Sequence, residues 1–298
     1  MFCPCPSCNA QSSRSIGPYP ATLEQRTALG LVEIHICNNC GIHFAKPLPT
    51  QAVLDSFYVS GEYWNKLVSS TSVQCAHTYS QSIQRCAWIS AQIGVAPRKV
   101  ADVGAGQGWM ALALGKTWGS DVLCYDFLEP DDKAAQAVKQ QSIHFKCYRL
   151  GTIPDQPTYD LIFLNQVLEH TVAPIFLLAS LRSALQPGAY LYVETPYRDD
   201  CFKSNVFPHM LFMDKPAMRQ LAKAAGFNIV ALEGFGQMPS MGSFYGKALR
   251  VSLWLACKFG LRTLANSIDC RMWDYDQKDD GIWLRALLRR PLTSEQRR

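Results

Sequence analysis

Short apolar runs alternate with amphipathic stretches from Lys99 onward, and this alternation constrains the fold of the 298-residue chain more than any other feature. Strands that alternate with helices predict an α/β fold with a doubly wound, mostly parallel sheet. The fourth apolar run has almost no polar residue, as expected of a strand covered on both faces. The seven expected strands read KVADVG, DVLCYDFLE, IHFKCYRL, YDLIFLNQ, AYLYVETP, FNIVALEGF and GIWLRALLRR.

The helices between these strands carry their own boundary signals. Pro216 lies in the first turn of the last helix and Gly226 follows its end, which is the usual asymmetry of the two residues. Gln186-Pro187-Gly188 is expected to end the helix before it. The expected helices are WMALALGKTW, DDKAAQAVKQQ, Pro174–Leu185 and DKPAMRQLAKAAG.

The turn after the first strand reads DVGAGQGW, with glycines at positions 104, 106 and 108. A dinucleotide-binding turn needs G-x-G-x-x-G, because its third glycine allows the helix to pack closely beside the pyrophosphate. Trp109 occupies that third position, and no Gly-Lys-Ser/Thr of a phosphate-binding loop follows. The turn therefore favours a nucleoside cofactor without a pyrophosphate, which needs close backbone approach and a carboxylate for its ribose. Asp126 and Glu129, at the end of the second strand, are the two candidates for that carboxylate.

Five segments resemble class I S-adenosylmethionine-dependent methyltransferases, and they occur in that family's order over about residues 79–290. They are DVGAGQG, the acidic LEP (128–130), YDLIFLNQVLEHTVAP (159–174), LQPGAYLYVETP (185–196) and HMLFMDKPAMRQLAKAAGF (209–227). The resemblance implies a Rossmann-like, seven-stranded sheet with helices on both faces and an antiparallel last strand. GIWLRALLRR would supply that last strand.

The resemblance also implies S-adenosylmethionine as the cofactor and assigns residues to it. Glu129 matches the ribose carboxylate best, because Glu-Pro followed by a helix resembles the family pattern, and Asp126 is the alternative. Asp155 is displaced from the acidic position that often lies near the adenine, so no adenine contact is assigned. Asp102 and the turn residues Gly104, Ala105, Gly106 and Gly108 would hold the methionine part, and Asn165 and Gln166 would line the cofactor and acceptor pocket.

Two C-x-x-C pairs, CPSC and CNNC, lie 28 residues apart near the start of the chain. Two such knuckles predict a tetrahedral Cys₄ zinc site, which is structural because it leaves no open position. Cys3 could replace Cys5 or stay free, and His35 or His43 could be ligands in a variant site. The expected zinc ligands are Cys5, Cys8, Cys37 and Cys40. Metal spacing in place of a disulfide scaffold indicates a reducing, cytoplasmic compartment.

The chain divides into three expected parts. Residues 1–50 form a zinc-ribbon-like module, residues 51–95 a helical linker or lid, and residues 96–298 a methyltransferase domain. A helical insertion is expected at 239–276. Its basic helix, 247–265, is interpreted as a cover for the sheet or a dimer face, with a membrane-surface contact as the alternative.

Composition excludes some partners. No run of 18 apolar residues occurs, which argues against a membrane span. The net charge of +5 is too small to indicate nucleic acid. RNA binding by the N-terminal module is disfavoured, because residues 1–50 hold only Arg14, Arg26 and Lys46 as basic residues. The expected partner is therefore a small-molecule acceptor.

His170, after the fourth strand, and His209, before the last helix, are the expected catalytic residues, since both segments flank the carboxyl edge of the sheet. Glu169 and Tyr197 are weaker candidates. The module, its prolines and the tyrosine-rich SFYVSGEYW resemble sugar C-methyltransferases and related polysaccharide and natural-product enzymes. The predicted function is methylation of a sugar or sugar-derived metabolite. The alternatives are an RNA methyltransferase with a zinc finger and a non-catalytic binding protein that retains the fold.

Overall fold

The computed structural model describes residues 4–54, 72–142, 145–237, 251–256, 258–259, 261, 264, 268, 274–277 and 281–293. They form two compact units. The first unit comprises the described residues of Met1–Phe57, Thr152–Glu233 and Trp283–Arg298. The second comprises those of Tyr58–Gly151 and Gly234–Ile282.

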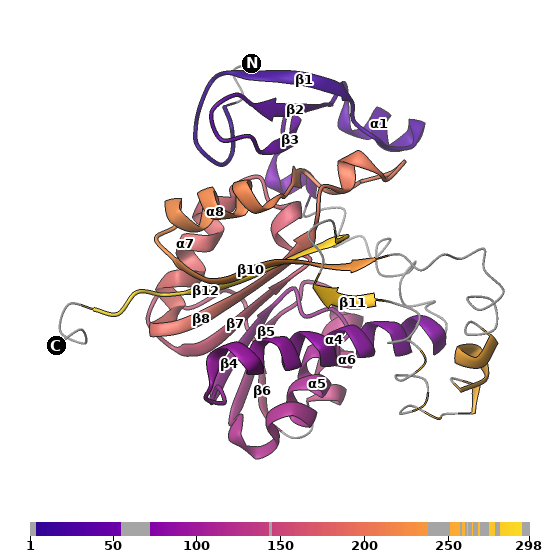
Figure 1. Ribbon diagram of the computed structural model, residues 1–298, viewed down its shortest axis with the longest axis vertical. Coiled ribbons are helices and arrows are strands. Elements are labelled where there is room, and N and C mark those ends of the chain that lie inside the picture. Colours follow the sequence, from indigo (N-terminus) through magenta and orange to yellow (C-terminus); the bar gives the residue numbers. More distant parts are fainter. Residues whose placement is uncertain are drawn as a thin grey trace. The chain divides into compact units, whose positions relative to one another are not determined.

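The N-terminal part of the first unit is a small antiparallel sheet (Figure 1). β2 (Glu33–Cys37) pairs with β1 (Ser13–Pro18) on one side and with β3 (His43–Lys46) on the other. The short helix α1 (Leu23–Leu29) connects β1 to β2. Thr22 and Gln25 form a capping box at its start, and this satisfies two backbone N–H groups that the helix itself leaves unpaired.

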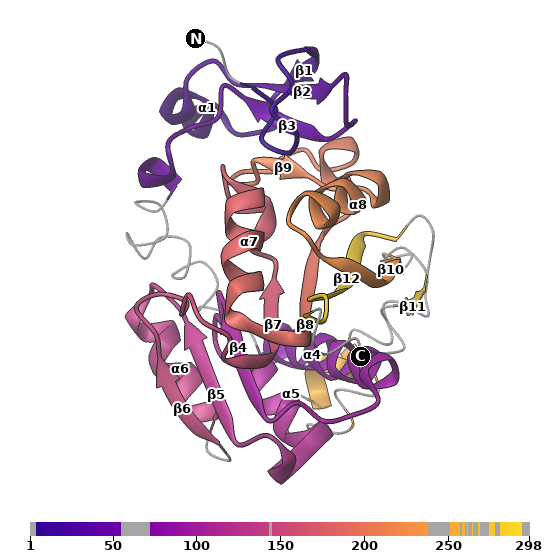
Figure 2. The same cartoon turned by 90° about the vertical axis from the view of Figure 1, so that its left-hand side faces the viewer.

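The fourth strand of this small sheet comes from a distant part of the chain. β9 (Leu211–Phe212) pairs antiparallel with β3, with Phe44 opposite Leu211 (Figure 2). The Ala45 N–H also donates to the Met210 carbonyl oxygen over 2.8 Å. The Cys-rich segment therefore shares one sheet with the residues that precede α8.

The remainder of the first unit is three strands with helices packed on them. β7 (Tyr159–Asn165) runs parallel to β8 (Leu185–Pro196), and β12 (Trp283–Arg289) runs antiparallel to β8. The expected antiparallel last strand is thus confirmed. α7 (Pro174–Ala184) packs on β8 and on α8 (Lys215–Ala224), which also contacts β12. Two short 3₁₀ turns, η2 (Leu168–His170) and η3 (Asp199–Cys201), also belong to this unit. β10 (Asn228–Gln237) begins in the first unit, and its residues from Gly234 onward belong to the second.

One boundary differs from the sequence expectation. Gln186-Pro187-Gly188 does not separate α7 from a later strand, because β8 already begins at Leu185. Leu185 pairs with Tyr159, and the register with β7 shifts before Leu161, which accommodates the proline. The Gly188 N–H is satisfied by the Arg290 carbonyl oxygen at 3.0 Å.

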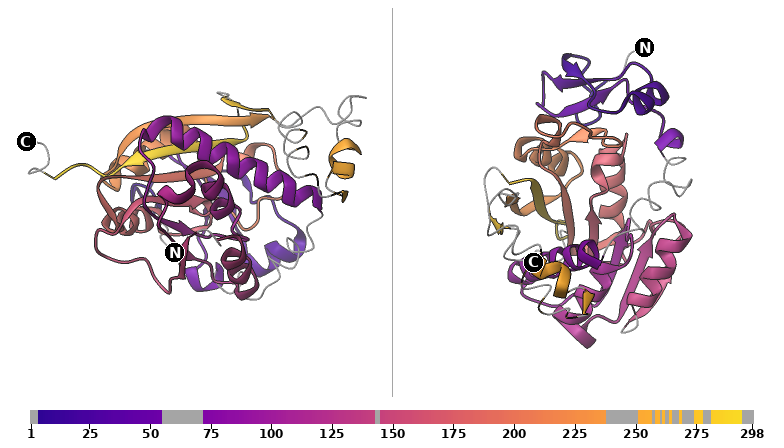
Figure 3. Two further views of the ribbon diagram at one scale, coloured as in Figure 1. Left: turned by 90° about the horizontal axis from the view of Figure 1, so that it is seen from below. Right: turned by 90° about the vertical axis from the view of Figure 1, so that its right-hand side faces the viewer.

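The second unit contains three parallel strands, β4 (Lys99–Val103), β5 (Cys124–Leu128) and β6 (Lys146–Arg149). The long helix α4 (Ser72–Ile93) packs along α5 (Trp109–Trp118), which also contacts α6 (Asp132–Gln141) (Figure 3). η1 (Gly119–Asp121) follows α5. Asp131 caps α6, since its side chain accepts a hydrogen bond from the Ala134 N–H at 2.8 Å.

The expected Rossmann-like α/β fold with a mixed sheet is confirmed, and all seven expected strands are present. One strand was not expected: β11 (Asp274–Gln277) pairs antiparallel with the end of β10, inside the segment interpreted as a helical insertion. Residues 251–256 of that segment are helical. The rest of the insertion, and the lid residues Tyr58, Tyr63 and Trp64, lie outside the described residues.

Candidate functional site

The glycine turn follows β4 and leads into α5. Gly104, Gly106 and Gly108 all have positive φ angles, of 75°, 56° and 79°, which side chains other than glycine rarely adopt. The Gly104 N–H donates to the Leu128 carbonyl oxygen over 2.8 Å, so the turn is anchored at the carboxyl end of β5. Alternating glycines are therefore required by backbone conformation.

Gly108 has a second role, in packing. A Cβ atom at this position would lie 2.7 Å from the Cα of Val138 in α6. In a dinucleotide-binding turn, a glycine at the next position lets a helix approach closely. Here Gly108 allows that close approach, and Trp109 is the first residue of α5. The Trp109 ring lies 6.2 Å from that of Tyr79 in α4.

Glu129 lies directly after β5, beside the glycine turn. Its Oε2 accepts a hydrogen bond from the Gly106 N–H at 2.8 Å, and its Oε1 accepts one from the Asp131 N–H at 3.0 Å. Burial raises the pKa of this carboxyl group to about 7, even though both backbone donors favour the ionised form. Each carboxylate oxygen can accept a further hydrogen bond, so ribose hydroxyl groups could be bound at the same place.

Asp126 lies inside β5, opposite Ala101 of β4, and accepts a hydrogen bond from the Cys124 thiol at 3.2 Å. Successive side chains of a strand alternate between its faces, so Asp126 lies on the face opposite to Tyr125. The Tyr125 hydroxyl donates to Asp102 Oδ2. Burial raises the pKa of Asp102 to about 6, and its Oδ1 has no hydrogen-bond partner within the described residues.

Arg149, at the end of β6, is a residue that the sequence analysis missed. Its guanidinium group donates to the Glu129 carbonyl oxygen from Nε at 3.0 Å and from Nη2 at 2.7 Å, and also to the Pro130 carbonyl oxygen. Its Nη1 lies 2.6 Å from Asp132 Oδ1. Arg149 thus holds the backbone of the turn that presents Glu129. An arginine at the end of a strand next to an acidic turn was the only signal in the sequence.

In the first unit, Asn165 ends β7 and Gln166 follows with a φ angle of 55°. Gln166 is held by Glu194 of β8: its N–H donates to the Glu194 carbonyl oxygen, and its Nε2 to Glu194 Oε1 at 3.2 Å. Glu194 is itself fully buried and paired with Arg285 of β12, whose Nε lies 2.6 Å from Oε2. This buried ion pair fixes the backbone at the end of β7.

His170 and His209, which the sequence analysis selected separately, lie together. Their ring centroids are 4.8 Å apart and the rings meet edge to face. His209 Nδ1 lies 2.8 Å from Asp199 Oδ2, which Lys203 Nζ also contacts at 2.9 Å. Glu169 is buried beside them, with its Oε1 3.7 Å from His170 Nε2. Tyr197 lies next to the end of β8 and forms an isolated bridge with Met213.

The two histidines have different electrostatic surroundings. Burial, and then the neighbouring His209, lower the pKa of His170 to about 3, so its imidazole is a weak base. Burial also raises the pKa of Glu169 well above its usual value. Burial would raise the pKa of Asp199 as well, but hydrogen bonding by His209 and the charge of Lys203 bring it below its usual value. An ionised Asp199 that holds Nδ1 of His209 orients that ring as in an Asp–His pair.

The N-terminal module supports the His209 segment directly. The Tyr19 hydroxyl donates to the His209 carbonyl oxygen at 2.8 Å, and the Val206 N–H donates to the Pro20 carbonyl oxygen at 2.9 Å. The next residue along, Met210, donates its N–H to the Glu169 carbonyl oxygen at 2.7 Å. The backbone on both sides of the histidine pair is therefore fixed.

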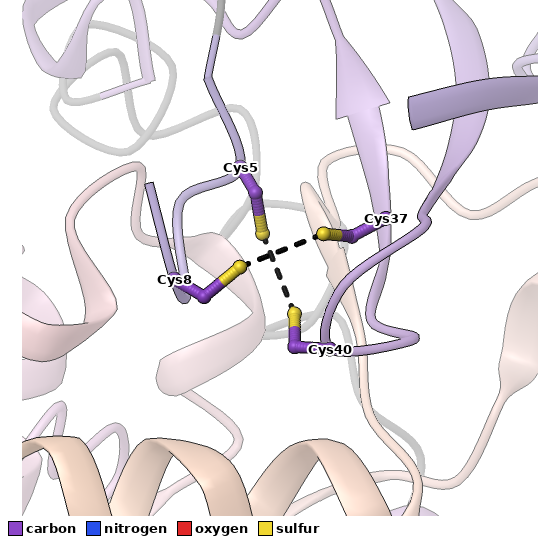
Figure 4. Close-up of side chains that lie close together, drawn as sticks. All are labelled: Cys5, Cys8, Cys37 and Cys40. Atoms are coloured by element: carbon purple, nitrogen blue, oxygen red, sulfur yellow. Dashed lines mark hydrogen bonds between the residues drawn. The ribbon is translucent and has the colours of Figure 1, made fainter. Parts of the chain in front are cut away.

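The four cysteines of the two C-x-x-C pairs converge (Figure 4). The Sγ atoms of Cys5 and Cys40 are 3.5 Å apart, and those of Cys8 and Cys37 are 3.6 Å apart. Zinc–sulfur bonds of about 2.3 Å at tetrahedral angles separate sulfur atoms by about 3.8 Å, so this arrangement fits Zn²⁺. Burial raises the pKa of the Cys40 thiol to about 11, an effect that a bound cation would reverse.

The two histidines beside the second cysteine pair have other partners. His43 Nδ1 lies 2.6 Å from Asp200 Oδ2, and His35 Nε2 lies 3.5 Å from Glu33. Cys3 lies outside the described residues. The geometry therefore favours the four-cysteine set over a ligand set that includes histidine.

A Rossmann-like fold with a glycine turn and a carboxylate at the end of the second strand is typical of class I methyltransferases that use S-adenosylmethionine. A family profile described as a methyltransferase domain matches residues 74–232, which is more than half of the chain. The chain belongs to this family.

Curated relatives match parts of the chain. The ubiquinone biosynthesis O-methyltransferase of Idiomarina loihiensis is 29% identical over 111 residues, 36% of this chain and 45% of that protein. The enzyme of the same name from Psychrobacter arcticus is 25% identical over 158 residues, 47% and 61% of the two chains. A tRNA U34 carboxymethyltransferase of Idiomarina loihiensis is 33% identical over 106 residues, 33% and 32% of the two chains. The matched segments thus span only 45% and 61% of the length of the first two relatives.

Solved structures show the same fold. An S-adenosylmethionine-dependent methyltransferase of Thermotoga maritima aligns with a TM-score of 0.51 and 13% identity, over 78% of this chain and 99% of that one. A methyltransferase solved in complex with the Haloferax volcanii Trm112 activator aligns with a TM-score of 0.50 and 16% identity, over 73% and 90% of the two chains. Within the residues that the structure describes, no helix combines the length and apolarity needed to cross a bilayer.

Proposed function

We propose that this protein transfers a methyl group from S-adenosylmethionine to a small molecule, and that the acceptor is a sugar or a sugar-derived metabolite. The observation that carries the cofactor part is the hydrogen bond from the Gly106 N–H to Glu129 Oε2, which joins the glycine turn to a buried carboxylate at the carboxyl ends of two parallel strands. In this proposal Glu129, not Asp126, binds the ribose hydroxyl groups.

The other cofactor contacts follow the same turn. Gly104, Ala105 and Gly106 offer backbone to the methionine part of the cofactor, and Asp102 offers its second carboxylate oxygen at the base of the turn. Gly108 serves chiefly to let α6 pack. Asn165 and Gln166 would line the cofactor and acceptor pocket, on a backbone fixed by Glu194.

His170 and His209 are proposed for the acceptor end of the site. Methyl transfer is a displacement at an activated sulfonium centre, so the protein mainly positions the acceptor and takes up its proton. In the metal-free protein, Asp199 holds Nδ1 of His209, which leaves Nε2 as the ring nitrogen that would take up the proton of the acceptor. Burial lowers the pKa of His170 to about 3, so His170 would orient the acceptor and not take up its proton.

The acceptor class rests on two kinds of support. The Cys-rich module with a methyltransferase domain resembles sugar C-methyltransferases, and several curated relatives are named ubiquinone biosynthesis O-methyltransferases. Both point to small-molecule acceptors. The four cysteines would bind one structural Zn²⁺, with sulfur separations close to those of a tetrahedral site.

The test is calorimetric titration of the zinc-loaded protein with S-adenosylmethionine, with NADH in a parallel cell. We expect saturable binding of the first and none of the second. Glu129→Ala should weaken cofactor binding at least tenfold, and Asp126→Ala, the matched control three residues earlier in β5, should leave it within about threefold. Unchanged binding in Glu129→Ala would refute the ribose assignment. A screen of nucleotide sugars against catechols, with mass detection of the methylated product, then tests the acceptor class.

RNA is the second candidate acceptor, because one curated relative is named a tRNA U34 carboxymethyltransferase. The N-terminal module contains only three basic residues, Arg14, Arg26 and Lys46, which is little for a phosphate backbone. Binding of tRNA that weakens steeply with added salt, together with methyl incorporation into the RNA, would favour this candidate over the sugar.

A further inference from the structure

Glu169, His170 and His209 form a compact cluster of potential metal ligands within the first unit. One ligand atom from each lies within 4.8 Å of the others. Two of the three come from the turn η2, and the third comes from the segment that leads into β9. The cluster is separate from the four cysteines, and its donors are two imidazole nitrogens and a carboxylate.

Glu169 is the most informative member of the cluster. It is only 1% exposed, and neither of its carboxylate oxygens has a hydrogen-bond partner within the described residues. A buried carboxylate without hydrogen bonds is costly, so buried groups of this kind are normally paired or bound to a metal. The nearest polar atom of the cluster is His170 Nε2, 3.7 Å from Oε1, which is too far for a hydrogen bond.

His209 is oriented as a metal ligand is. Its Nδ1 lies 2.8 Å from Asp199 Oδ2, so Nε2 is the ring nitrogen available to a cation. A carboxylate on the far nitrogen of a metal-bound histidine fixes its tautomer and ring orientation and strengthens binding. Tyr19 and Met210 hold the backbone at His209 and Glu169, which keeps the two ligands at a fixed separation.

We propose that Glu169, His170 and His209 bind one divalent first-row transition-metal cation, with further coordination positions open to oxygen ligands. Two histidines and one carboxylate are a ligand set that zinc and related metals use in sites with an open position. Metal–ligand bonds of about 2.1 Å separate opposite ligands by at most about 4.2 Å, so the cluster needs to contract by only about half an ångström. Asp199 is a positioning residue for His209.

The local charges accommodate a cation. Glu169 and Asp199 contribute two negative charges when ionised, and Lys203 contributes one positive charge that is already paired with Asp199. Two neutral imidazoles add none. A divalent ion therefore enters a cluster with an excess of negative charge, and it supplies the partner that the Glu169 oxygens lack.

One consequence rests on the proposed function. If the cluster faces the acceptor, the open positions suit an acceptor with adjacent oxygen atoms, such as a vicinal diol or an enediol. A bound cation lowers the pKa of a coordinated hydroxyl group. His209 would then act as a ligand instead of a proton acceptor. The cation site itself is defined without reference to S-adenosylmethionine, so its test does not depend on turnover.

The experiment is titration of the full-length protein with Mn²⁺, followed by electron paramagnetic resonance, on protein that carries one equivalent of zinc for the four cysteines and no excess zinc. Mn²⁺ is paramagnetic and prefers oxygen and imidazole donors over thiolates, so it reports this cluster and not the cysteines. We expect one bound Mn²⁺ per chain, and spin-echo modulation that shows coupled imidazole nitrogens. His209→Asn keeps a donor for Asp199 but removes the ligand nitrogen, and should weaken binding at least tenfold. Glu169→Gln should do the same.

Asp199→Asn should lower Mn²⁺ affinity about 10- to 100-fold, which is the range for loss of a partner behind a metal-bound histidine. The matched control is His35→Gln, a histidine of the same unit outside the cluster, which should bind Mn²⁺ as the wild type does. No saturable Mn²⁺ binding by the wild type, or a signal without nitrogen coupling, overturns the proposal whatever the variants do. S-adenosylmethionine binding measured on the same samples separates this result from failure of the proposed function.

Discussion

The Tyr19 hydroxyl donates a hydrogen bond of 2.8 Å to the carbonyl oxygen of His209, a residue 190 positions later in the chain. Tyr19 is almost fully buried, and burial raises the pKa of its hydroxyl well above the usual value. The contact joins the Cys-rich N-terminal module to the segment that carries a proposed catalytic residue. The module therefore contributes to the site and does not merely precede it in sequence.

Tyr19→Phe should destabilise the protein by about 1–3 kcal/mol, because it leaves the buried His209 carbonyl oxygen without its donor. It should also lower the rate of methyl transfer while S-adenosylmethionine affinity stays unchanged. Urea unfolding and calorimetry measure the two effects. Tyr148→Phe is the control, since Tyr148 is 59% exposed on β6 and should tolerate the change. Equal stability of the two variants would show that the Tyr19 contact contributes nothing.

Gly108→Ala should destabilise the protein more than Gly151→Ala does. At Gly108 the added Cβ would meet the α6 backbone at 2.7 Å, and its φ angle of 79° is unfavourable for alanine, by about 1–2 kcal/mol from conformation alone. Gly151 has no neighbour within 4 Å of an added Cβ, so the same substitution there is the matched control. Thermal unfolding of the two variants gives the comparison. A Gly108→Ala variant as stable as the control would contradict the close packing of the turn on α6.

Cofactor affinity should rise between pH 6 and pH 8. Burial raises the pKa of Glu129 to about 7, and only the ionised carboxylate accepts hydrogen bonds from both ribose hydroxyl groups and the backbone. The ionised fraction grows about tenfold across this interval, so the dissociation constant should fall by a similar factor. Burial also raises the pKa of Asp102, to about 6. Glu129→Gln removes only the Glu129 contribution, and its profile should be correspondingly flatter.

The same carboxyl group predicts the direction of a stability change. Its pKa in the folded protein lies above the value of 4.5 expected for an exposed glutamate, so the folded state binds the proton more tightly than the unfolded state. The favourable contribution of this group to the free energy of unfolding is complete below pH 4.5 and is lost as the pH rises through 7. The free energy of unfolding of the wild type minus that of Glu129→Gln, measured with urea at several pH values, should show that loss. A difference that grows with pH would contradict the assignment.

Arg149→Ala should weaken S-adenosylmethionine binding about three- to tenfold without contacting the cofactor in this proposal. The guanidinium group holds the Glu129 and Pro130 carbonyl oxygens, and its loss frees the turn that presents the carboxylate. Arg149→Lys should recover little, because an ammonium group cannot reproduce the planar set of donors. Lys146→Ala removes a positive charge from the exposed side of the same strand and serves as control. Equal losses in Arg149→Ala and Lys146→Ala would indicate a general charge effect.

Zinc analysis should find one tightly bound ion per chain held by the four cysteines. Cys8→Ser and Cys40→Ser should each release zinc and lower the unfolding temperature, since structural zinc contributes folding free energy. Cys201→Ser, at an exposed cysteine, should retain the metal. The Cys8→Ser protein should lose methyl transfer before it loses cofactor binding, because the module supports the His209 segment. Full zinc content in both ligand variants would refute the Cys₄ site.

The sequence predicts local elements well where spacing and turn chemistry coincide. α5 occupies the predicted WMALALGKTW, and Asp131 and Asp214 cap the two helices expected after the second and fifth strands. The helix expected to end at Gln186-Pro187-Gly188 ends at Ala184, but the next strand begins at Leu185 and not at the expected Ala189. Pairing of Leu185 with Tyr159 and of Gly188 with Arg290 outweighs the usual effect of proline and glycine on a strand. Tertiary hydrogen bonds of this kind are absent from any local pattern.

The same limit applies to the site. The four cysteines and the Gly106–Glu129 pair follow from motif spacing, since each lies within a local turn or at the ends of adjacent strands. The pairing of His170 with His209, and their contacts with Asp199 and Tyr19, do not follow. Those residues come from segments that are distant in the sequence, and the second of them adjoins β9, which pairs with β3. No periodicity in the sequence predicts a two-residue strand.

The pairing of β9 with β3 limits where this chain can be divided in engineering or in recombination. A cut near residue 50, which divides the sequence most naturally, would separate Phe44 from Leu211 and leave the edge of β9 exposed. A chimera that exchanges the Cys-rich module between related enzymes should therefore fold only if the segment around residues 205–213 is exchanged with it. The part that can be exchanged is discontinuous in sequence. Each Cys-rich module is therefore expected to function only with the segment around residues 205–213 of its own enzyme.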